Sequence, residues 1–415
     1  MLIITPQRFD RLRCWLHLLT MNHPAQRFKL FRSSAFALAI CLCVTAFLTP
    51  VALAAERNAA LNKTKTSVEK QKNTAAKAAQ RKTAQRKKTA TTKVVTGKAF
   101  GNSSAVKQLA REIAQKHKLP PAWVQQQIAG ARLLPQILQL VLPPSTPQVK
   151  NWQAYRARFL TESRIQTGAR FWREHTLQLD RAFAQTGVEP RYIVGILGVE
   201  TFYGQHQGQY KLIDALSTLS LNFPKEHPQA AERQAFFQDE LGYFLKQQRT
   251  QPASKPVLGS YAGASGWPQF MPSSIAKFAV DFDGDGRIDL SNSAADAIGS
   301  VANYFKAFGW QPGVPTHFAV DVQTVSETDL SALLAPDIVP SWSASHLADK
   351  QAVLEDEGKR FSGPLALVQL HNANETPSYV AGTDNFFVIT RYNRSSYYAL
   401  AVIELGLAVE REIKK

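Results

Sequence analysis

The chain has 415 residues, of which 45% are hydrophobic, and it carries a formal net charge of +17. The charge is unevenly distributed: residues 1–55 contribute +5, residues 56–98 contribute +11, and residues 99–415 contribute only +1. A nucleic-acid-binding domain normally carries its basic residues on its own folded surface, so this distribution argues against a nucleic-acid partner. All three cysteines lie within residues 1–55, which excludes a disulfide framework or a cysteine metal site from the rest of the chain.

The N-terminal segment has the features of a secretory signal peptide. An apolar run at 35–48 follows three basic residues within 27–32 and precedes the small-x-small sequence at 52–54. We therefore expect residues 1–54 to form a signal peptide. An uncleaved anchor is the alternative, because the apolar run and the residues that follow it are just long enough to span a bilayer.

Residues 55–101 are predicted to form a basic, disordered linker. Within them, residues 56–98 consist mainly of Lys, Ala, Thr and Gln and contain no aromatic residue. Such a segment cannot bury enough apolar surface to offset its chain entropy. It could contact anionic membrane or wall polymers electrostatically, or it could be a plain solvated linker.

The folded body is expected from residue 102 onward. Apolar spacing predicts helices at 103–140 with a break at 120–121, at 165–200 with a break at 187–190, at 231–248 and at 293–308. Alternating or β-branched runs predict strands at 364–371 and 385–391. Helix dominates and the strands come late, so we expect a mainly helical α+β fold.

One carboxylate ends an apolar segment. Residues 191–200 are almost wholly apolar until Glu200, and Gly195 and Gly198 permit a neighbouring element or a sugar to approach closely. A carboxylic acid against apolar walls holds its proton near neutral pH, which a general acid for a glycosidic oxygen requires. The alternative is an ordinary solvated or salt-bridged Glu at the end of a helix.

Two segments have the composition of a saccharide-binding surface. Residues 259–272 interleave small residues with Ser260, Tyr261, Trp267 and Gln269, and residues 392–398 form a second cluster of aromatic and amide side chains. Sugars bind through aromatic faces and through hydroxyl or amide hydrogen bonds. The alternative for the first segment is a Gly-rich turn that leads into a helix.

An acidic loop has calcium-binding spacing. Residues 281–289 place Asp at positions 1, 3, 5 and 9 of an EF-hand-type loop and Gly at position 6. Position 12 is Asn292, so we expect a longer loop, 281–296. The expected ligands are the side chains of Asp281, Asp283, Asp285 and Asp296 and the backbone carbonyl of Arg287. We expect a structural Ca²⁺; an acidic turn without metal is the alternative.

Together these motifs resemble the membrane-bound lytic transglycosylase B family. The matching stretches are 198–201 (Gly-Val-Glu-Thr), 262–272, the acidic loop and 296–305, and their order and spacing agree with the family. The similarity extends from about residue 102 to residue 410.

The resemblance implies a lysozyme-like catalytic core within residues 102–415, with additional helical and small β-containing subdomains. It implies cleavage of the β-1,4 bond between N-acetylmuramic acid and N-acetylglucosamine in peptidoglycan, leaving 1,6-anhydromuramoyl ends. Glu200 then acts as acid and afterwards as base, and the sugar's own 6-hydroxyl replaces water. We expect a periplasmic or cell-envelope monomer that needs no organic cofactor.

By the same resemblance, the saccharide groove is lined by Tyr155, Ser260, Gln269, Tyr304, Tyr392, Asn393 and Tyr398. This chain departs from the family's pattern at two places where the family contacts the peptide of its substrate. The stretch after Pro224 is less basic than the family's paired arginines, and Phe236 replaces an aromatic residue that carries a hydroxyl. The N-terminus also lacks the family's lipoprotein signal.

Two alternative functions remain open at this point. A hydrolytic muramidase would need a second carboxylate near Glu200, for which Asp214 and Asp239 are candidates. A non-catalytic peptidoglycan-binding or scaffold protein could use the same groove.

Overall fold

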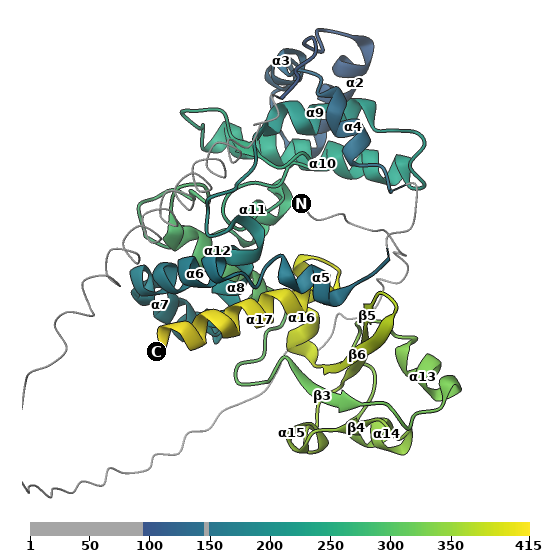
Figure 1. Ribbon diagram of the computed structural model, residues 1–415. Helices are drawn as coiled ribbons and strands as arrows, with labels where there is room; N and C mark the ends of the chain where they lie inside the picture. Colours follow the sequence, from purple (N-terminus) through teal and green to yellow (C-terminus); the bar gives the residue numbers. More distant parts are fainter. Residues whose placement is uncertain (1–93, 145–148) are drawn as a thin grey trace, which may run out of the picture. The chain divides into compact units, whose positions relative to one another are not determined.

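The structure is a computed structural model that describes residues 94–144 and 149–415 (Figure 1). The predicted signal peptide and most of the predicted linker lie outside these residues. Within the described part of the chain, no helix is both long enough and apolar enough to cross a bilayer.

The first helices in chain order are α2 (Ser104–His117), α3 (Pro121–Gly130), α4 (Pro135–Leu140), α5 (Trp152–Ala157), α6 (Glu162–Glu174), α7 (Thr176–Thr186), α8 (Pro190–Thr201), α9 (Leu212–Asn222) and α10 (Ala230–Thr250). The later helices are α11 (Pro272–Phe278), α12 (Ala294–Ala307), α13 (Glu327–Leu334), α14 (Ala344–Asp349), α15 (Asp356–Lys359), α16 (Asp384–Tyr392) and α17 (Ser396–Ile413). The strands are β1 (Tyr210–Lys211), β2 (Leu258–Gly259), β3 (His317–Asp321), β4 (Val353–Leu354), β5 (Ala366–Asn372) and β6 (Glu375–Gly382). The predicted helical segments and the mainly helical α+β class are confirmed.

Helices α8 and α17 pack against each other in the largest hydrophobic cluster. Two glycines make this packing possible. A Cβ atom at Gly195 would collide with the carbonyl oxygen of Val402, and one at Gly406 would collide with the carbonyl oxygen of Arg191. The neighbour that Gly195 admits is therefore α17, whose N-terminal end carries Tyr398.

A second hydrophobic cluster is built from α2, α3, α4, α9 and α10. Pro121 begins α3 at its first position, where a missing N–H is tolerated, and this explains the break predicted at 120–121. Ordered pairing starts before residue 102: Gly97 N donates to Leu133 O at 2.7 Å. The folded part therefore includes the last residues of the predicted linker.

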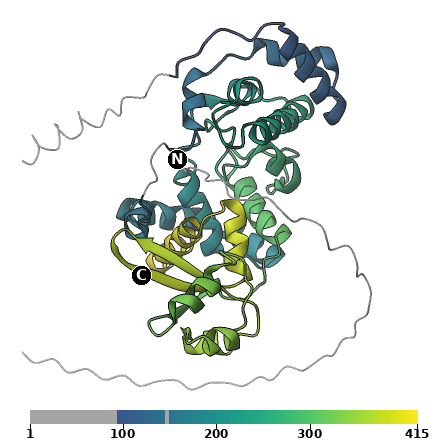
Figure 2. The ribbon, with the colours of Figure 1, turned by 90° about the vertical axis from the view of Figure 1, so that its right-hand side faces the viewer.

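The third cluster lies under a four-stranded antiparallel sheet with the order β4-β3-β6-β5. The short helices α13, α14 and α15 flank this sheet (Figure 1, Figure 2). The predicted strand at 364–371 is confirmed as β5.

The predicted strand at 385–391 is wrong, because these residues lie in α16. The side chain of Thr383 accepts a hydrogen bond from Asn385 N at 3.2 Å and caps the helix. Asn385, Phe386 and Ile389 are fully buried at helical spacing. The β-branched residues in this run imitate a strand locally, but burial follows the helical period.

Candidate active site

Glu200 lies in the last turn of α8, directly before an unusual reversal of the chain. Phe202 and Tyr203 both adopt left-handed backbone conformations, with φ of 53° and 56°. Such conformations cost bulky residues roughly 1–3 kcal/mol each and persist only where surrounding contacts enforce them. The reversal ends α8 one residue after Glu200, which is half-buried.

The hydroxyl of Thr201 fixes this reversal. Thr201 is fully buried, and its Oγ1 donates to Trp267 O at 2.8 Å while it accepts from Gly204 N at 3.0 Å. These bonds attach the end of α8 to the segment that carries Gln269. The hydrogen bonds of Thr201 therefore connect the segments that carry Glu200 and Gln269, although these two residues are 69 positions apart in the chain.

The Glu200 carboxyl has one hydrogen-bond donor among the described residues. Tyr398 Oη donates to Glu200 Oε1 at 2.6 Å, and the Tyr398 side chain is fully buried. Burial raises the pKa of Glu200 to about 7, and the Tyr398 hydrogen bond opposes this rise. In the described part of the chain no Lys, Arg or His forms an ion pair with Glu200. The carboxyl is therefore poised to hold a proton near neutral pH.

Three tyrosines form a ladder that starts at Glu200. The ring centroids of Tyr398 and Tyr392 are 6.3 Å apart, and those of Tyr392 and Tyr304 are 4.9 Å apart. Tyr392 Oη donates to Pro268 O at 2.6 Å and Tyr304 Oη donates to Arg391 O at 2.7 Å. The hydroxyls of Tyr392 and Tyr304 are thus both bonded to backbone carbonyls of the protein. These two tyrosines therefore support the packing around Glu200 rather than offering free hydroxyls to a ligand.

Tyr155 differs from these three tyrosines in its hydroxyl group. Its hydroxyl is buried and has no hydrogen-bond partner among the described residues. Burial, and secondarily the charge of Glu200, raise the pKa of Tyr155, which places the phenol within electrostatic reach of the acid. Buried hydroxyls are rarely left unpaired, so this group is available to a ligand.

Gln269 and Ser260 are held by the backbone. Gln269 has φ of 51°, and its Nε2 donates to Gln207 O at 3.1 Å and to Gly266 O at 2.9 Å. These bonds occupy the amide nitrogen. Ser260 Oγ accepts from Ala264 N at 3.0 Å and closes the turn there.

Asn393 follows α16 directly as its C-terminal cap. Its backbone carbonyl accepts from Ser395 N at 2.6 Å. Asn393 therefore lies in the short connection between Tyr392 and Tyr398, the two tyrosines of the ladder that are nearest to Glu200 along it.

Neither candidate for a second carboxylate is free to serve Glu200. Asp214 Oδ1 accepts from Arg132 N at 2.8 Å. Asp239 Oδ1 pairs with Lys116 Nζ at 2.8 Å and with His117 Nε2 at 3.0 Å. Both acids lie on helices of the second hydrophobic cluster, whereas Glu200 lies on α8, a helix of the first.

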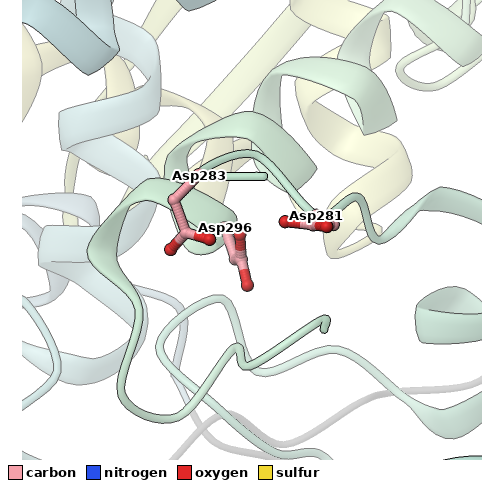
Figure 3. A group of neighbouring side chains, drawn as sticks. All are labelled: Asp281, Asp283 and Asp296. Carbon is pink, nitrogen blue, oxygen red and sulfur yellow. The ribbon is translucent and has the colours of Figure 1, made fainter. Parts of the chain in front are cut away.

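Three carboxylates of the acidic loop converge (Figure 3). Oxygen atoms of Asp281, Asp283 and Asp296 lie within 4.8 Å of one another. Within the described chain none of the three pairs with a Lys, Arg or His. Converging like charges without a cationic side chain fit a hard divalent cation. Asp285 is outside this group, and its Oδ1 accepts from Arg287 N at 2.8 Å.

The shape of the loop explains the convergence. Gly286, with φ of 85°, permits the turn, and its N–H donates to Asp281 Oδ2 at 2.8 Å. Asp296 enters from the first turn of α12, where its Oδ1 accepts from Phe282 N at 2.7 Å. Asp296 therefore joins the loop to α12.

Sequence reasoning missed the supporting role of Thr201 and Gln207. Each donates to a backbone carbonyl of a distant segment: Thr201 Oγ1 to Trp267 O at 2.8 Å and Gln207 Nε2 to Ser291 O at 3.0 Å. Only the position of Thr201 directly after an isolated acid could have drawn attention to it.

The chain is similar to characterised cell-wall enzymes. A family model described as a transglycosylase SLT domain matches residues 101–407. Membrane-bound lytic murein transglycosylase B of Escherichia coli is 36% identical over 336 residues, which cover 75% of this chain and 84% of that protein.

Solved structures agree. The E. coli lytic transglycosylase SLT35 in complex with calcium superposes with a TM-score of 0.65 at 35% identity, covering 78% of this chain and 97% of that one. SltB3 of Pseudomonas aeruginosa in complex with NAG-anhNAM-pentapeptide gives 0.61 at 27% identity, covering 74% and 80%. The motifs, the fold and these similarities agree, and the chain therefore belongs to the transglycosylase SLT family of lytic murein transglycosylases.

Proposed function

We propose that this protein cleaves the β-1,4 bond between N-acetylmuramic acid and N-acetylglucosamine in peptidoglycan with Glu200 as its only acid and base. The observation that carries the proposal is the environment of Glu200. Its pKa is raised to about 7 by burial, its partner is the Tyr398 hydroxyl, and the two candidates for a second carboxylate are engaged elsewhere.

In the first step the protonated Glu200 donates its proton to the glycosidic oxygen as the bond to C1 breaks. An acid with a pKa near the working pH is efficient because it is protonated in the resting enzyme yet acidic enough to give up its proton. The half-buried carboxyl at the end of α8 meets this requirement.

In the second step the Glu200 carboxylate removes the proton from the muramoyl 6-hydroxyl, whose oxygen bonds to C1. The hydroxyl belongs to the same sugar, so it needs no encounter with a separate nucleophile. Tyr398 Oη already donates to Oε1 and stabilises the carboxylate. The other oxygen, Oε2, is left for the substrate. The product is a 1,6-anhydromuramoyl end.

The residues around Glu200 divide into two roles. The unpartnered hydroxyl of Tyr155, the Oε1 atom of Gln269 and the side chain of Asn393 are the groups we assign to direct sugar contacts. Ser260 and Tyr304 hold the backbone that presents them.

Calcium fits the acidic loop as a structural ion. Asp281, Asp283 and Asp296 would hold it, and Asp285 and the carbonyl of Arg287 remain predicted ligands. A bound cation supplies charge neutralisation that ties the loop to the start of α12. An E. coli relative has been solved with calcium, which supports the assignment.

We also propose that residues 1–54 export the protein to the periplasm and that the basic segment 56–98 holds it near anionic membrane or wall polymers. The mass of the mature N-terminus after export tests the first part. Release of the protein from isolated envelopes by salt, and its loss when 56–98 is deleted, tests the second.

The reaction type is tested by the mass of the released muropeptides. Purified sacculi digested with the wild-type protein should yield anhydro ends, which are one water lighter than reducing ends. Reducing ends would identify a hydrolase instead. Glu200→Gln should bind sacculi and release nothing; release of muropeptides by this variant would show that another group is the acid.

A further inference from the structure

A row of aromatic and cationic side chains extends from Tyr155 beside Glu200. The ring centroids of Tyr155 and Phe159 are 5.2 Å apart. The guanidinium carbon of Arg164 lies 5.2 Å from the centroid of Phe159 and 5.0 Å from that of Phe202, so the cation sits between two rings. Phe202 follows the acid by two residues, and the row therefore borders the catalytic end of α8.

The charge of Arg164 has no counter-ion among the residues that the structure describes. No carboxylate of the described residues lies within ion-pair distance of it. Its Nη1 donates to Arg158 O at 3.0 Å, and its Nε is buried without a hydrogen-bond partner. Removing a charge from water is costly unless it is paired, and stacking on rings compensates only in part.

Arg158 adds a second cation at the same place. Its side chain is exposed, its guanidinium carbon lies 5.9 Å from the centroid of Tyr155, and within the described ranges it also has no acidic partner. Two unpaired guanidinium groups therefore border the row, although residues 99–415 carry a net charge of only +1. Such a local excess suits an anionic ligand.

We propose that Arg164, assisted by Arg158, binds a carboxylate of the peptide carried by the glycan strand. The inference rests on the proposed function, since the substrate must be a peptide-bearing strand. The two sugars lack a carboxylate of their own once the lactyl group is in amide linkage, so the anion must come from the peptide. The planar guanidinium is the group best suited to a carboxylate, and the rings of Phe159 and Phe202 hold its plane. A relative has been solved with a pentapeptide-bearing fragment.

The test compares two substrates of the same glycan length, one bearing peptides and one stripped of them by an amidase. The lactyl carboxylates that the amidase frees are converted to amides, so that the stripped strand carries no anion. Arg164→Gln should raise KM for the peptide-bearing strand by about tenfold, the size expected for one lost charge-assisted hydrogen bond. Its kinetics on the stripped strand should stay within about twofold of wild type. Arg170→Gln, an exposed arginine on the same helix α6, should change neither.

Two further variants keep the test decisive if Arg164→Gln folds poorly. Arg164→Lys retains a cation between the rings but loses the planar fork, and it should raise KM for the peptide-bearing strand alone. Arg158→Gln removes the exposed guanidinium over Tyr155 but keeps the backbone carbonyl that accepts from Arg164, and it should produce a smaller, salt-sensitive rise in KM for the peptide-bearing strand alone. Equal losses on both substrates would show that Arg164 only supports the fold, and the proposal would be wrong. Failure of the wild type to form anhydro ends on either substrate would instead overturn the proposed function.

Discussion

Tyr398 Oη donates a 2.6 Å hydrogen bond to Glu200 Oε1, although the two residues are 198 positions apart in the chain. The close packing of α8 on α17 brings them together, and the two helices contribute buried side chains to the same hydrophobic cluster. The hydrogen bond that opposes the burial-induced rise in the pKa of Glu200 thus comes from a helix that the local sequence around Glu200 does not contain.

The rate should fall on the alkaline side as Glu200 loses its proton. Because burial raises its pKa to about 7, the fraction able to donate a proton decreases from about pH 7 upward. We expect kcat/KM on soluble glycan fragments to drop about tenfold per pH unit well above that value. A rate that stays constant to pH 9 would contradict this role for Glu200.

Tyr398→Phe should shift this alkaline limb to higher pH. The lost hydrogen bond lowers the pKa of Glu200 in the wild type, so its removal raises that pKa further. The carboxylate also loses a charge-assisted hydrogen bond, and we expect kcat to fall by about 10- to 100-fold. Tyr379→Phe, whose hydroxyl accepts from Gln369 Nε2 in the small sheet, is the control and should leave the pH profile unchanged.

Glu200→Gln should stabilise the protein most at alkaline pH. The folded-state pKa of Glu200 lies above the unfolded value of about 4.5, so the folded protein binds the proton more tightly. The free energy of unfolding therefore declines from about pH 4.5 to about pH 7 through this group, and the decline is complete above pH 7. The difference between variant and wild-type thermal midpoints, measured from pH 4 to pH 9, should grow over that window. A constant difference would show that the pKa of Glu200 is not raised.

Gly195→Ala should destabilise the fold. The added methyl group would strike the carbonyl oxygen of Val402, which belongs to the backbone of α17 and cannot rotate away. Overpacking of this kind costs about 1–3 kcal/mol in the free energy of unfolding, and activity should fall with it because α17 carries Tyr398. Gly130→Ala, at the end of α3 with open space around it, is the matched control and should be neutral in denaturant titrations.

Calcium should raise the thermal midpoint of the wild type, and Asp283→Ala should abolish the effect. Binding to the folded state alone stabilises by about 2.7 kcal/mol at a calcium concentration of 100 times Kd. Asp285→Ala tests whether the ligands include Asp285 or are limited to Asp281, Asp283 and Asp296. Asp285 has the spacing expected of a ligand, but it lies outside the group of converging carboxylates. An unchanged calcium response in Asp285→Ala would restrict the ligands to the converging group, and no response in the wild type would refute the site.

The local motifs were readable from the sequence because each lies on one continuous segment. The acid at the end of an apolar helix and the acidic loop follow from residue type and spacing alone. The strand assigned to 385–391 failed because β-branched and aromatic residues suit both a strand and a buried helix face, and the Thr383 cap decides between them.

Contacts between distant segments could not be read in this way. The sequence and the family resemblance predicted Tyr398 as a residue of the saccharide groove, but its hydrogen bond to Glu200 was not predicted. Residue type and spacing did not indicate that Thr201 bonds to Trp267 O or that Arg164 lies between two rings. In each case the contact depends on how helices pack, and pattern within one segment does not specify that packing.

The order of these segments in the chain has a consequence for when the enzyme can act. A ribosome makes Glu200 long before it makes Tyr398. The hydrogen bond from α17 to Glu200 can therefore form only after the end of the chain has been made. A chain that is still being synthesised lacks the Tyr398 hydroxyl that donates to Glu200. The surroundings of Glu200 are therefore complete only after nearly the whole polypeptide has been made and α17 has packed.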